Sequence, residues 1–163
     1  MTTTPMIATA PDAIQLLSND HREVKALFKA YQQLVDADGD DEEKEQLAQE
    51  ICTKLTVHAD VEEELFYPAV RDVLPDEEDL VDEAAVEHAC ARELIVQIEQ
   101  SAPDEPMYDA KVKVLGEYVD HHAREEEDVL FPKVQASGLD IVGLGQDMAQ
   151  RMDELLADMA DDA

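Results

Sequence analysis

The chain of 163 residues is poor in basic residues and in aromatic ones: it has no tryptophan, three phenylalanines and only 12 lysines and arginines. Against them stand 41 aspartates and glutamates, which give a formal net charge of −29 at pH 7. A surface of this charge repels phosphate backbones and anionic lipid headgroups, so it argues against a nucleic-acid or membrane-surface partner. It attracts cations, although a solvated surface, such as one suited to high salt, is the simpler explanation of the charge.

Cysteines and long apolar runs are scarce as well. Cys52 and Cys90 form neither a CxxC pair nor a disulfide framework, and reduced thiols of this kind are typical of the cytoplasm. No basic segment followed by an apolar one opens the chain, as it would in a secretory signal. No apolar run approaches the roughly 20 residues that a membrane helix needs. We therefore expect a cytoplasmic protein without a membrane partner.

Apolar residues recur at steps of three and four along most of the chain, and prolines and glycines fall at the breaks. This pattern predicts an all-α protein with long helices over 12–35, 42–73, 78–100 and 107–136, and a shorter helix over 141–160. Pro68 predicts a kinked last turn in the second helix, and Pro132 has the same place in the fourth. Long helices joined by short loops favour an up-down-up-down antiparallel four-helix bundle.

The predicted helices divide the chain into three parts. Residues 1–11 form a lead that we expect to be poorly ordered, residues 12–136 form the bundle, and residues 137–163 form an additional C-terminal helix. Met148 and Met152 follow helical spacing in this last helix, which is more typical of core packing than of a binding surface. We expect the helix to pack on the bundle or on a partner, where it would support a homodimer.

Four of the five histidines fall on the apolar stripes, one in each long predicted helix. They are His21, His58, His88 and His122. Glu62 follows His58 by four residues, and Glu126 follows His122 by four, so each pair stands on one helix face within reach of a common ion. A buried ionised carboxylate costs several kcal/mol unless it is paired or bound to a cation. Since no lysine or arginine shares these stripes, a metal is the expected partner.

The two His-Glu pairs belong to an internal repeat. The segment HADVEEELFYP, residues 58–68, matches HAREEEDVLFP, residues 122–132, and DHR at 20–22 matches EHA at 87–89. Two helical hairpins with matching ligands suit two metal ions bridged by carboxylates better than one ion.

The repeat also distinguishes His122 from its neighbour His121. His121 has its own carboxylate at the same spacing, Glu125, but only His122 aligns with His58. Because successive helical residues point about 100° apart, His121 is expected behind the ligands or on the surface.

The donor set favours iron. Six nitrogen and oxygen ligands fit two octahedral ions, whereas structural zinc prefers four ligands, often with cysteine. Two bridging glutamates, four histidines and a bridging oxo or hydroxo group would leave two coordination positions for water, dioxygen, peroxide or another side chain.

The order of histidine, HxxxE, histidine and HxxxE, with the endings LFYP and VLFP, resembles the hemerythrin-like (HHE cation-binding) family over residues 13–136. The resemblance implies a left-handed antiparallel bundle around an oxygen-sensitive di-iron centre. The implied iron ligands are His21, His58, Glu62, His88, His122 and Glu126.

One departure from the family bears on function. Its oxygen carriers use five histidines and two carboxylates, whereas only four histidines match here. The remaining position is open to water, a tyrosine, Glu63 or Glu127. Asp20 and Glu87 each precede a histidine, and they either support the ligands or are simply solvated.

Several functions are compatible with this pattern. We expect a non-haem di-iron protein that binds or reacts with dioxygen, peroxide or nitric oxide. If it is an enzyme, the expected activity is catalase-like decomposition of peroxide. The alternatives are a non-enzymatic iron or oxygen sensor or iron storage module, and a purely structural acidic bundle without metal.

Overall fold

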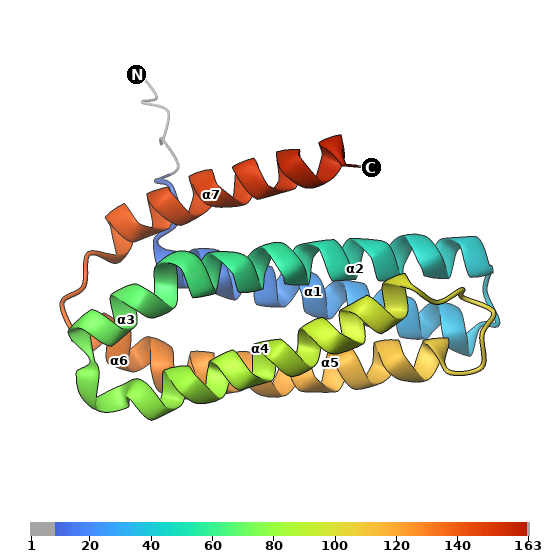
Figure 1. Cartoon of the computed structure of the whole chain (residues 1–163), viewed down its shortest axis with the longest axis horizontal. Helices are drawn as coiled ribbons and strands as arrows, with labels where there is room; N and C mark the ends of the chain where they lie inside the picture. Colours follow the sequence, from blue (N-terminus) through green and yellow to red (C-terminus); the bar gives the residue numbers. More distant parts are fainter. Residues whose placement is uncertain (1–8, 163) are drawn as a thin grey trace, which may run out of the picture.

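The computed structural model describes residues 9–162, and every regular element in this range is helical (Figure 1). The α-helices are α1 (Ala13–Asp36), α2 (Asp41–Val61), α3 (Tyr67–Val73), α4 (Glu78–Glu99), α5 (Tyr108–Glu125), α6 (Phe131–Ala136) and α7 (Ile141–Asp161). Short helical turns of other types are η1 (Glu62–Phe66), η2 (Pro75–Glu77) and η3 (Glu126–Leu130). The all-α class is confirmed. The prediction of a poorly ordered lead concerns mainly residues 1–8, which lie outside the described range.

Local sequence fixes where the first helices begin. Asp12 accepts a hydrogen bond from the backbone N–H of Gln15, and the Gln15 side chain accepts one from the backbone N–H of Asp12, which closes a capping box before α1. Asp40 caps α2 by accepting from the backbone N–H of Glu42. The acidic first turn of α2 also matches the positive end of the helix dipole. These caps set the start of the two helices that carry His21 and His58.

A π-helical turn lies before each of two prolines: η1 separates α2 from α3 before Pro68, and η3 separates α5 from α6 before Pro132. The kink expected from Pro68 stays a prediction. Proline has no N–H to donate, and its ring clashes with the carbonyl four residues earlier, so a wider turn relieves both problems. The wider turn also shifts the helix register. Val129 is 42% exposed, whereas its neighbours Leu130 and Phe131 are buried.

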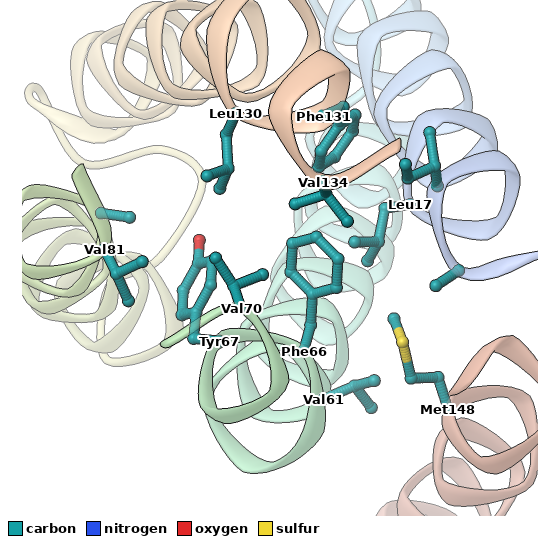
Figure 2. Packing of buried hydrophobic residues seen from close by; sticks show 13 residues of the cluster. Leu17, Val61, Phe66, Tyr67, Val70, Val81, Leu130, Phe131, Val134 and Met148 are labelled. Atoms are coloured by element: carbon teal, nitrogen blue, oxygen red, sulfur yellow. The ribbon is translucent and has the colours of Figure 1, made fainter. Parts of the chain in front are cut away.

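The bundle has helical arms that consist of α1, of α2 with η1 and α3, of α4, and of α5 with η3 and α6. These arms lie side by side, as Figure 1 shows. α1 packs against α2 and α5, and α4 packs against α5 and α2. Between them lie two apolar clusters. One gathers around Phe66, Phe131 and Met148 (Figure 2), and the other around Ile51 and Leu115. In every arm the histidine lies between residues of the first cluster and residues of the second, so a layer of polar side chains separates the two apolar clusters.

α7 packs on its own chain, against α1, α2 and η1. Met148 of α7 is fully buried, and Arg151 of α7 forms an ion pair with Glu64 of η1 at 2.7 Å. Gly145 permits this approach, because a Cβ atom there would lie 2.6 Å from the backbone nitrogen of Ala13. None of the helices in residues 9–162 is long and apolar enough to cross a membrane.

Candidate metal centre

The structure brings the six predicted ligands together in the layer between the two apolar clusters. They form two groups, each with its ligand atoms within 4.8 Å of one another. One group contains His21, His58 and Glu126, and the other contains Glu62, His88 and His122. Two histidines and one carboxylate in each group form a nitrogen and oxygen donor set that suits iron, zinc or copper.

Each glutamate also reaches into the other group. Glu62 Oε1 lies 3.4 Å from His88 Nε2 in its own group and 2.8 Å from His58 Nε2 in the other. Glu126 Oε1 lies 3.3 Å from His21 Nε2 and 3.1 Å from His122 Nε2. Each carboxylate therefore lies within 3.4 Å of a histidine nitrogen from both groups.

Several buried atoms at the centre of this layer have no hydrogen-bond partner within residues 9–162. Glu62 is fully buried and Glu126 is 2% exposed. The unpartnered atoms are His21 Nε2, His58 Nε2, both oxygens of Glu62 and Oε1 of Glu126. His58 Nε2 and Glu62 Oε1 are close, but not in the orientation of a hydrogen bond. Because such atoms are costly to bury unsatisfied, the donor set fits a cation at this position.

The pKa values of His58, His122 and Glu62 are shifted in the directions that favour a charged histidine beside a charged carboxylate. Burial disfavours the charged form of His58, yet Glu62 and Asp20 raise its pKa to about 10. Burial likewise opposes protonation of His122, but Glu126 and Glu62 raise its pKa to about 12. The pKa of Glu62 is held well below its usual value, against the effect of burial, chiefly by His58. In the metal-free protein, the raised pKa values of His58 and His122 thus favour positive charge beside the buried carboxylates.

Each of the four histidines turns its Nε2 inward and bonds a carboxylate through its Nδ1. The pairs are His21 with Glu127 at 3.0 Å, His58 with Asp20 at 3.0 Å, His88 with Glu63 at 3.2 Å and His122 with Glu87 at 3.2 Å. A carboxylate at Nδ1 fixes the tautomer and orientation of the ring and makes the inward nitrogen a better ligand.

The outer carboxylates correct one sequence interpretation and support another. Asp20 and Glu87 do support histidines, although each supports the histidine of a neighbouring arm instead of the one that follows it in sequence. Glu63 and Glu127 were candidates for the open coordination position, but they bond the outer nitrogens of His88 and His21. The repeat already indicated that Glu63 and Glu127 share a role, because they occupy equivalent positions in it.

Tyr67 adds a seventh polar group to the layer. Its hydroxyl donates to Glu126 Oε2 at 3.1 Å and lies 3.3 Å from His122 Nε2 and 3.4 Å from His88 Nε2. Figure 2 shows this hydroxyl among the apolar side chains. The repeat-equivalent residue is Phe131, which stacks on the ring of His21. At this position of the repeat, one half of the centre therefore has a hydroxyl group that the other half lacks.

A small cavity of about 50 Å³ adjoins the histidines on the side of the second apolar cluster. Its remaining walls are mostly apolar and include Val24, Leu55, Ala91, Ile95 and Val119. A cavity of this size and lining suits a small uncharged molecule.

Comparison with known proteins agrees with this geometry. The sequence profile of the Hemerythrin HHE cation binding domain matches residues 12–134. The chain belongs to this family. Among solved structures, this hemerythrin-family chain is similar to a Hemerythrin HHE cation binding domain-containing protein from Mycobacterium kansasii. The TM-score is 0.71 and the identity 24%, over 89% of this chain and 87% of the other. That likeness supports the helical fold.

The hemerythrin-family chain is also similar to part of a larger protein. It is 32% identical over 118 residues to a DNA nickase from Nostoc sp.. The match covers 71% of this chain but 31% of the nickase, so the chain spans about a third of that protein's length.

Proposed function

We propose that this hemerythrin-family domain holds two iron ions, with Glu62 and Glu126 as bridging ligands and the four histidines as terminal ligands. The observation that carries the proposal is the reach of each glutamate into both ligand groups, at 2.8 Å for Glu62 and 3.1 Å for Glu126. The proposal takes the helical arms as an up-down-up-down antiparallel four-helix bundle, which the pairwise packing of neighbouring arms supports.

Bound iron would supply reversible electron transfer and open positions for dioxygen, peroxide or nitric oxide. The chain's own residues supply the surroundings. The four outer carboxylates hold the histidines in one tautomer. The largely apolar walls of the cavity suit a small uncharged molecule. Burial, with Glu62 and Glu126 nearby, raises the pKa of Tyr67 well above its usual value, so its hydroxyl keeps its proton near neutral pH.

The enzymatic form of the proposal is decomposition of hydrogen peroxide. The test is peroxide turnover by iron-loaded protein after dialysis against a chelator, which removes loosely held iron. Turnover that survives dialysis and is lost in His58→Ala would support a catalase-like enzyme. Iron-loaded protein that leaves peroxide intact would refute it and leave reversible binding of a small ligand.

A sensor is the second candidate, because α7 rests directly on the π turn that begins at Glu62. Arg151 of α7 pairs with Glu64 in that turn, so occupancy of the centre and docking of α7 share a structural element. Limited proteolysis tests this function, and faster cleavage in α7 without iron supports it. Iron storage is less compatible with the structure, since a cavity of about 50 Å³ has no room for a mineral.

The nicking of DNA is a property of the larger Nostoc protein, and the net charge of −29 disfavours contact with phosphates here. A plasmid-nicking assay with iron-loaded protein tests this directly, and no nicking is expected. The cytoplasmic location stays a prediction; Cys52 is buried, Cys90 is exposed, and both are free thiols.

A further inference from the structure

His121 lies outside the buried layer but has a ligand set of its own. Its side chain is 64% exposed, and its Nε2 lies 3.3 Å from Glu125 Oε1 and 3.8 Å from Glu87 Oε2. The three ligand atoms fall within 4.8 Å of one another, as they do in each buried group. One imidazole and two carboxylates from α4 and α5 thus converge on a single point at the surface.

Glu87 connects this cluster to the centre, because its two oxygens face different ways. Oε1 bonds His122 Nδ1 at 3.2 Å, while Oε2 faces His121. Glu87 also lines the cavity beside the histidines, together with His88 and His122. One carboxylate therefore touches the surface cluster, the cavity and an outer nitrogen of the buried layer.

From this arrangement we infer that Glu87, His121 and Glu125 form a peripheral site for a divalent transition-metal ion, which receives ferrous iron before it enters the centre. The role in loading rests on the proposed di-iron function. A neutral imidazole with two carboxylates suits Fe²⁺, and it balances the two charges of the ion. Three protein ligands leave the other positions to water, so the ion is held more weakly than in the centre and can move on.

The buried position of the centre explains why such a site is useful. Glu62 has no exposed surface, so a hydrated ion cannot meet it directly from solution. The acidic surface raises the local concentration of cations near this cluster. A simple ion pair between protonated His121 and its two acids is the competing explanation, and metal binding distinguishes the two.

The first test counts bound iron by anaerobic equilibrium dialysis of the full chain against ferrous iron. We expect a third, weaker equivalent beyond the two in the centre, and its loss alone in His121→Ala. Alanine suits this exposed helical position, so the variant is expected to fold. Glu87 is not substituted, because it also supports His122. A wild type that binds two equivalents, or a third equivalent that persists in His121→Ala, would overturn the inference.

The second test follows the rate at which limiting ferrous iron reaches the centre, observed by the ultraviolet and visible spectrum after exposure to air. We expect His121→Ala and Glu125→Gln to load about tenfold more slowly at low salt, with a smaller difference at high salt. Glu93→Gln is the matched control, since Glu93 is exposed on α4 and forms no ion pair within the described chain. Equal rates in all variants would refute the loading role, whereas absence of any bound iron would refute the di-iron proposal itself.

Discussion

Replacing Tyr67 with phenylalanine removes one hydroxyl from the buried layer and places the same residue type at this position of the repeat as Phe131. Tyr67 is 3% exposed, and its hydroxyl donates to Glu126, which is 2% exposed. A hydrogen bond to a charged group contributes about 1.5–3 kcal/mol to stability. For a chain of this size, each kcal/mol lowers Tm by about 2–4 °C, so we expect Tyr67→Phe to lower it by about 3–12 °C.

The assay is thermal and urea unfolding of metal-free protein in chelator, followed by the visible spectrum of iron-loaded protein. Tyr31→Phe is the matched control, because Tyr31 is also buried and donates to a carboxylate, that of Asp109, at 2.6 Å. Both variants should lose stability, but only Tyr67→Phe should change the spectrum, since only its hydroxyl lies beside proposed ligands. Unchanged stability and spectrum in Tyr67→Phe would refute the placement of its hydroxyl in the centre.

Further predictions concern pH, charge, packing and access. The raised pKa of His58, about 10 against an ordinary value of about 6.5, stabilises metal-free protein fully below pH 6.5. That contribution is lost as pH rises through 10, so the urea midpoint in chelator should fall over this range, while iron affinity rises as the proton becomes easier to displace. Glu62→Gln breaks a buried charge pair and should cost metal-free protein about 3–5 kcal/mol in urea unfolding and reduce bound iron below two per chain. Gly145→Ala should cost about 1–3 kcal/mol and increase proteolysis of α7, because its Cβ would meet the backbone of Ala13; unaltered cleavage would contradict the close approach. Ala91→Leu fills the cavity and should slow reaction with dioxygen in stopped-flow without changing iron content; an unchanged rate would exclude this cavity as the route.

The inward histidines could be predicted because helical periodicity alone places them. His21, His58, His88 and His122 stand at regular steps from apolar neighbours, and the repeat confirmed the register of the two HxxxE segments. The constant helical period fails after Glu126, where Val129 is exposed and Leu130 is buried. A constant period of 3.6 residues does not include a π turn, and the proline that favours such a turn also allows a kink.

The contacts between helices were harder to predict. Asp20 was a recognisable candidate for supporting a histidine, but its partner is His58, 38 residues away, and not the adjacent His21. Pairing of this kind depends on how the arms are rotated relative to one another, which the sequence does not specify. The docking of α7 depends in the same way on Gly145, whose missing side chain matters only once Ala13 lies against it.

Metal content, measured together with the ultraviolet and visible spectrum of air-exposed protein, tests the central claim most directly. We predict close to two irons per chain, absorption bands typical of bridged ferric iron in the near ultraviolet, and loss of both in His58→Ala and His122→Ala. One zinc per chain, or no metal after anaerobic reconstitution with iron, would contradict the ligand assignment and the function that depends on it.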